Sequence, residues 1–82
     1  MEDFLSTREM GWLLGRSAAS VRRMIRDGEI EGIRLSEGFR VPKAEALRVS
    51  RERIGSEAGR KLSDRELEGL IDTVLATNEE GP

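Results

Sequence analysis

The chain contains no cysteine, no histidine and no tyrosine among its 82 residues, and each absence excludes a class of function. Without cysteine there is no disulfide, and with histidine missing as well a zinc site would need carboxylates alone, which proteins rarely use. The usual nucleophile and base pairs of covalent catalysis cannot be assembled, and no glycine-rich phosphate-binding motif is present. We therefore expect a protein that is not an enzyme and that uses no metal or cofactor.

Long apolar runs and an excess of positive charge are also missing. No stretch approaches the length of a membrane span or a signal-peptide core, and the N-terminus is acidic, so we expect a cytoplasmic protein that does not enter a membrane. The net charge is −2, but it is unevenly distributed. Residues 1–61 hold 13 Lys and Arg against 10 Asp and Glu, a net charge of +3, whereas residues 62–82 hold 1 against 6, a net charge of −5. Because charges act over a Debye length of roughly 10 Å, the first part can still attract a polyanion.

The first half of the chain carries the start and stop signals of two short helices. Ser6 and Glu9 have the spacing of a capping box, and Leu5 and Met10 that of a hydrophobic staple. A helix should therefore begin directly after Ser6 and end before Gly15, where glycine permits a left-handed exit. A second helix should follow after only three residues, the separation that a helix-turn-helix requires.

This second helix should begin after Ser17 and end near Asp27. At 100° per residue, Val21, Met24 and Ile25 share one apolar face. The opposite, cationic face carries Ala19, Arg22, Arg23 and Arg26. Small residues in the first turn, including Ser20, allow close approach of another surface, and the free amides there favour a phosphate.

A short hairpin should follow the second helix. Residues 30–35 and 39–41 flank a turn that contains glycine, which is typical of a two-stranded wing. Arg34 and Arg40 flank this turn and Lys43 follows it, so a second basic element lies beside the first. A solvated charged face is the ordinary interpretation of an isolated arginine cluster, and the adjacency of two basic elements favours anion binding instead.

Seven segments in this order carry a resemblance to a known family: Leu5–Glu9, Leu14–Ser17, Ser20–Ile25, Gly28–Ile30, Arg34, Gly38–Pro42 and Leu47. Together they span a little over half of the chain, from Leu5 to Leu47, and resemble the excisionase-like and MerR-type winged helix-turn-helix DNA-binding domains. The resemblance implies that the second helix enters the major groove, with Ser20, Arg22 and Arg23 facing DNA. It also implies that Arg34 and Arg40 hold the wing against the backbone or the minor groove.

The remainder should form a third helix, a linker and a final helix. Pro42 suits the start of the third helix, whose Arg48, Arg51 and Arg53 either touch phosphates or form a solvated face with an Arg48 to Glu52 ion pair. We expect a DNA-binding domain over residues 1–54, a flexible linker over 55–61, an amphipathic helix over 62–78 and a disordered tail over 79–82.

The final helix should begin with a second capping box, Ser63 with Glu66. Its apolar face consists of Leu67, Leu70, Ile71, Val74 and Leu75. This face can fold back on the first domain, pair with a second copy or dock on another protein, and we expect it to mediate self-association as a homodimer or cooperative oligomer on DNA. Trp12, the only tryptophan, either covers the edge of the core or anchors the same kind of interface.

The sequence therefore predicts a mainly α protein with a winged helix-turn-helix and a C-terminal amphipathic helix. The expected function is sequence-specific binding of double-stranded DNA at the nucleoid, as a transcription regulator or an excisionase-type architectural factor in recombination. A phage or plasmid packaging or replication adaptor, and a protein-interaction module whose arginines meet an acidic partner, are the alternatives.

Overall fold

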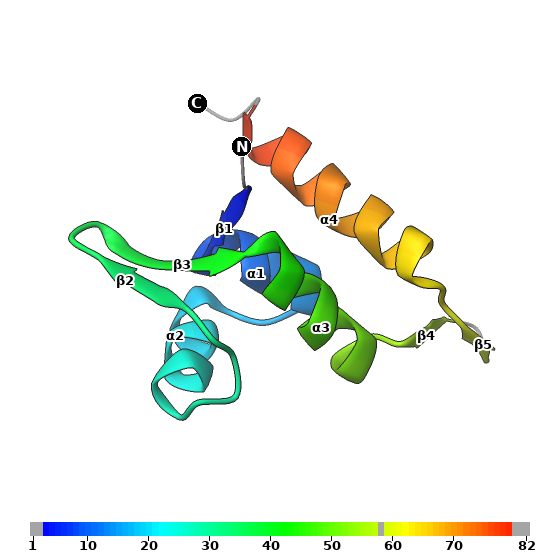
Figure 1. The fold of residues 1–82 in the computed structure, drawn as a ribbon, viewed down its shortest axis with the longest axis horizontal. Helices are drawn as coiled ribbons and strands as arrows, with labels where there is room; N and C mark the ends of the chain where they lie inside the picture. Colours follow the sequence, from blue (N-terminus) through cyan, green and yellow to red (C-terminus); the bar gives the residue numbers. More distant parts are fainter. Residues whose placement is uncertain (1–2, 58, 80–82) are drawn as a thin grey trace.

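The computed structural model describes residues 3–57 and 59–79, and this part of the chain forms four helices and five short strands. The expectation of a mainly α fold is confirmed (Figure 1). The elements are, in order, β1 (Phe4–Ser6), α1 (Thr7–Leu14), α2 (Ala18–Arg26), β2 (Ile33–Leu35), β3 (Gly38–Pro42), α3 (Lys43–Arg53), β4 (Ser56–Glu57), β5 (Arg60–Lys61) and α4 (Asp64–Glu79). Apart from Glu79, the predicted disordered tail lies outside the described residues.

The local helix signals are confirmed. The Ser6 hydroxyl accepts from the Glu9 amide at 3.1 Å, and the Glu9 carboxylate accepts from the Ser6 amide at 2.8 Å, which completes the capping box. Gly15 ends α1 in the left-handed conformation, with φ of 70°. The Ser17 hydroxyl then caps α2 by accepting from the Ser20 amide at 3.1 Å. Both helices therefore begin and end near the residues that the capping patterns predicted.

The turn between α1 and α2 depends on a close approach that the sequence patterns did not reveal. The Gly11 carbonyl accepts from the amides of both Gly15 and Arg16, the latter at 2.8 Å. A Cβ atom at Gly11 would collide with the Arg16 carbonyl oxygen. Glycine at this position therefore allows the chain to fold tightly back from α1 into α2.

The sheet has three strands in the order β1-β3-β2, all antiparallel, whereas only the β2–β3 hairpin was predicted. β1 pairs Leu5 with Val41, and both side chains are fully buried. The first strand of the hairpin begins later than predicted, at Ile33 and not at Ile30. The amide of Ile30 is bonded to the Met24 carbonyl in the turn that closes α2, so it is not available to a strand.

The C-terminal helix α4 packs across α1 and α3 (Figure 1), which is the first of the three alternatives for its apolar face and corrects the expectation that this face mediates self-association. Leu67 and Ile71 are fully buried, and Ile71 belongs to the same core as Val21 and Val49. Two further members of the predicted face, Val74 and Leu75, are half-buried, and only Leu70 is exposed, at 40%. The helix folds back because α1 and α3 of the same chain provide apolar surface that covers its apolar face.

The connection between α3 and α4, expected to be a flexible linker, contains the short hairpin of β4 and β5. The Leu62 amide donates to the Gly55 carbonyl at 2.8 Å, and Leu62 is buried. This hydrogen bond fixes the start of α4 beside the end of α3. The helix then shares one core with the first part of the chain.

Candidate nucleic-acid interface

Helix α2 divides its surface as the sequence predicted. Val21 and Met24 are buried in the core, whereas the side chains of Arg22, Arg23 and Arg26 are exposed together with Ala19. The helix begins at a capped N-terminus and ends beside the loop to the hairpin. One side of α2 thus holds the fold together while the other presents three cations.

The register of the hairpin determines which of its arginines faces α2. Arg34 lies opposite Phe39, and Ile33 lies opposite Arg40. Directly opposite residues share one face of a sheet and consecutive residues alternate, so Arg34 and Arg40 project from opposite faces. The basic element predicted around the turn is therefore divided between the two faces of the hairpin.

Three arginines meet in a groove of about 300 Å³ between α2 and the hairpin. Arg22 and Arg26 approach it from the helix, and Arg34 approaches it from β2. The remaining lining residues are Leu35, Ser36, Gly38 and Phe39. We call this feature the arginine groove. It combines concentrated positive charge with backbone and apolar surface, a combination suited to a sugar-phosphate chain.

None of these three arginines has an ion-pair or hydrogen-bond partner in the part of the chain that the structure describes. The cations of α3 differ in this respect. Arg48 binds Glu45 and Glu52, at 2.6 and 2.8 Å. The pairs of Arg51 with Asp64 and of Arg53 with Glu29 are equally direct. Positive charge is thus neutralised on α3 and left available in the arginine groove.

These ion pairs resolve the choice that the sequence left open for the third helix. The predicted pair of Arg48 with Glu52 is confirmed, and hydrogen bonding to Glu45 raises the pKa of the Arg48 guanidinium further above its usual range. The carboxylate partners of Arg51 and Arg53 come from outside α3, unlike those of Arg48. The α3 arginines therefore hold the protein's own elements together.

Lys43 does not join the basic element, contrary to the sequence-based expectation. Its ammonium lies 2.8 Å from the Asp72 carboxylate of α4, and this hydrogen bond raises the pKa of Lys43. Arg40 is half-buried and donates to the carbonyl of Phe39 at 2.9 Å. Arg40 also borders a hollow that α4 residues line, so both residues lie toward α4, Arg40 by strand register and Lys43 through its pair with Asp72.

The other side of α2 borders a second hollow, of about 270 Å³. Arg23 and the half-buried Ser20 line it together with Arg16, an exposed arginine of the inter-helix turn. Ser17 lies nearby in sequence, but its hydroxyl is engaged in capping α2. Sequence patterns did not single out Arg16, because a turn residue belongs to no helix face.

An acidic residue fixes the loop between α2 and β2. The Glu45 carboxylate accepts from the Glu31 amide at 2.8 Å and from Arg48 at 2.8 and 2.6 Å, and these bonds lower the pKa of Glu45 despite its partial burial. Arg48 also donates to the Glu29 carbonyl at 3.3 Å. This network anchors the loop to α3 and so sets the position of β2 relative to α2.

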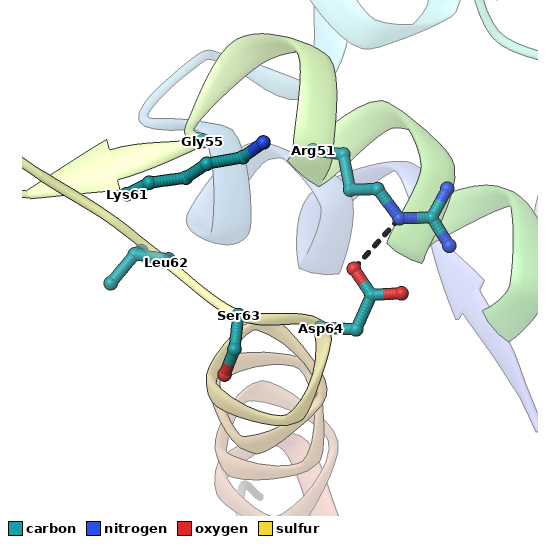
Figure 2. Close-up of a pocket in the computed structure, with 6 residues that line it drawn as sticks. All are labelled: Arg51, Gly55, Lys61, Leu62, Ser63 and Asp64. Atoms are coloured by element: carbon teal, nitrogen blue, oxygen red, sulfur yellow. Dashed lines mark hydrogen bonds and ion pairs between the residues drawn. The ribbon is translucent and has the colours of Figure 1, made fainter.

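A separate hollow of about 530 Å³ lies where α3 meets the start of α4. Figure 2 shows Arg51 reaching from α3 to Asp64, with Nε and Oδ1 2.8 Å apart. Hydrogen bonding to Arg51 lowers the pKa of Asp64, and the same bond raises that of Arg51. Its arginine is neutralised by a carboxylate, and Lys61 also lines the hollow. The pair of Arg51 with Asp64 therefore links α3 to the start of α4.

The described residues contain no group of three or more acidic side chains placed to hold a metal ion, and no helix among them is long and apolar enough to cross a membrane. Comparisons with protein-family models, with curated proteins and with solved structures each find no match. The geometry of the arginine groove is therefore the principal basis for a functional proposal.

Proposed function

We propose that the chain binds double-stranded DNA through the exposed face of α2 and the arginine groove, and that it catalyses no reaction. In this proposal it is a small winged helix-turn-helix transcription regulator or an excisionase-type architectural factor. The observation that carries the proposal is the convergence of Arg22, Arg26 and Arg34 on one groove without a carboxylate partner among the described residues.

The arrangement of elements supports this function. Two helices separated by three residues are followed by a hairpin, and helix-turn-helix proteins place the second such helix in the major groove. With α2 in that position, the arginine groove between helix and hairpin lies where a sugar-phosphate backbone passes. Arg23 and Arg16, on the other side of α2, are placed to approach the opposite strand.

The distribution of charge explains how an acidic chain would bind DNA. Phosphate contacts release condensed counterions, and this gain depends on the cations at the interface and not on the net charge. The cations of α3 are paired within the protein, so they contribute little to this field. With few free arginines, one copy should bind weakly, and its affinity should fall with salt in proportion to the number of phosphate contacts.

The proposal is tested by titrating a fluorescent random-sequence duplex with the full-length chain at several salt concentrations. The Arg22→Ala/Arg26→Ala variant should bind more weakly, and its slope of log affinity against log salt should be shallower by about two. Arg65→Ala is the matched control, because Arg65 is an exposed arginine on α4, outside the arginine groove and without an ion pair among the described residues. Selection from a random duplex library then measures any sequence-specific excess.

Two results would overturn the proposal. One is unchanged anisotropy at low salt with protein that circular dichroism shows to be folded. The other is binding of poly-glutamate as tight as that of duplex, which would indicate a protein-interaction module with an acidic partner.

A further inference from the structure

Trp12 is exposed on α1, and the proposed DNA contact does not use it. Half of its surface, 50%, is accessible, and it is the only tryptophan in the chain. The guanidinium of Arg8 lies over its ring, 5.8 Å from the centroid. Together these two residues form an apolar projection with a positive charge at its side, which we call the Trp12 knob.

The outer face of the sheet carries a matching depression. Phe4, Ile33 and Leu35 are exposed at 37%, 44% and 44%. With the side chain of Arg40 they line a hollow of about 270 Å³, which we call the outer-sheet pocket. Three large apolar side chains gathered in one hollow are a stronger sign of a contact surface than single exposed apolar residues.

An acidic hollow adjoins this pocket. Phe4 and Arg40 also border a space of about 490 Å³ that Asp3, Glu9 and Asp72 line. Glu9 is engaged in the capping box and Asp72 is paired with a lysine, whereas Asp3 is exposed and has no ion pair among the described residues. A carboxylate without an ion pair among the described residues therefore lies beside the apolar pocket, although it contributes to the field that raises the pKa of Lys43. The Trp12 knob carries the complementary charge, that of Arg8.

We propose that the Trp12 knob of one copy inserts into the outer-sheet pocket of a second copy, with Arg8 beside Asp3. The occupant is a second copy because this chain carries both halves of the contact. One half is an aromatic side chain with a cation over its ring, and the other is an apolar pocket, lined also by Arg40, with the Asp3 carboxylate in the adjoining hollow. Trp12 lines neither hollow, so knob and pocket are separate surfaces and the contact is head-to-tail. It differs from the self-association by α4 that the sequence suggested.

The contact leaves the arginine groove open. Leu35 borders both hollows, but Arg34 projects from the face of the hairpin opposite the outer-sheet pocket, and Arg22 and Arg26 lie on α2, so a second copy in the pocket does not cover the three arginines. One knob in one pocket buries far less area than a standard stable interface of roughly 1,600 Å². Association should therefore be weak, and it can be measured without DNA, independently of the proposed function.

Fluorescence of the single tryptophan reports the contact directly. Emission recorded with front-face detection should shift to shorter wavelength as protein concentration rises to millimolar, and sedimentation should show a parallel gain in mass. Leu35→Lys places a charge in the outer-sheet pocket and should abolish both effects while Trp12 is retained. Leu70→Lys is the matched control, because Leu70 is similarly exposed, at 40%, on α4, and it should behave as the unmodified chain does.

A mixing experiment distinguishes head-to-tail contact from a symmetric dimer. Trp12→Ala lacks the knob and Leu35→Lys lacks the pocket, so each variant alone should remain monomeric. Their mixture retains one complete knob and pocket and should form a 1:1 heterodimer that grows no further. Ile33→Lys provides a second pocket variant, with circular dichroism as the check on folding.

Three outcomes would overturn the proposal: no spectral shift or mass increase in the unmodified chain, association that persists in either pocket variant or in Trp12→Ala, and the absence of a heterodimer in the mixture.

Discussion

Arg34 and Arg40 project from opposite faces of one hairpin. The register pairs Arg34 with Phe39 and Ile33 with Arg40, so Arg34 enters the arginine groove while Arg40 borders the outer-sheet pocket. Two arginines that flank the same turn therefore belong to different surfaces, and they form a matched pair for experiment.

If the arginine groove contacts DNA, Arg34→Ala should weaken binding to all duplexes, and the slope of log affinity against log salt should become shallower by about one. Arg40→Ala removes the same charge from the other face and should change the slope much less. Fluorescence anisotropy across a salt series measures both. Equal losses in the two variants would argue against a role for the groove.

Gly11→Ala should destabilise the protein by about 1 to 3 kcal/mol, because the new methyl group meets the Arg16 carbonyl in a tightly packed turn. Gly69→Ala is the control, since nothing lies within 4 Å of the added carbon and alanine is the better helix former, by about 0.5 to 1 kcal/mol. Urea unfolding should therefore shift in opposite directions for the two variants. A Gly11 variant as stable as the parent would contradict the close approach.

Ile71→Ala should cost about 2 to 5 kcal/mol of stability, because the side chain is fully buried in the core shared by α4 and the first part of the chain. Leu70→Ala, one residue earlier and 40% exposed, should cost much less. Denaturant titration compares the two. Nearly equal and small effects would mean that α4 does not pack on the rest of the chain in solution.

Ser50→Ala should leave stability unchanged or raise it by up to about 1 kcal/mol. Ser50 is fully buried, and its hydroxyl has no hydrogen-bond partner in the described part of the chain. Removing an unsatisfied buried hydroxyl removes a desolvation cost. Thermal unfolding of the variant measures the change, and a marked fall in melting temperature would show that the hydroxyl is satisfied in solution.

Acid should weaken the start of α4. Hydrogen bonds from Arg60 and the Ser63 amide lower the pKa of Glu66 to about 2, below its ordinary value of 4.5. Since the folded pKa is the lower one, the stabilisation is fully present above pH of about 5 and is lost as pH falls toward 2. Glu66→Gln should reduce the fall in stability over this range, which urea titrations at several pH values would reveal. An identical pH dependence in the variant would count against these hydrogen bonds.

Local features of the fold could be predicted from the sequence because they depend on residues three or four positions apart. The capping box of Ser6 and Glu9, the glycine exit of α1 and the cationic face of α2 all belong to this class. The positions of Arg22 and Arg26 in the candidate site follow from the same helical periodicity.

The tertiary structure decided everything that depends on which elements meet. β1 joins the sheet because Leu5 and Val41 are buried against each other, a pairing with no local signal. Lys43 is lost from the basic element because α4 brings Asp72 to it. The apolar face of α4 is also decided by a distant contact. An amphipathic pattern indicates that one face of a helix will be covered, but it does not identify the surface that covers it.

The sequence by itself thus determined the helices and their caps, through short-range hydrogen bonding and periodicity. Packing and strand register determined which charges remain free, because ion pairs and faces depend on neighbours distant in the chain.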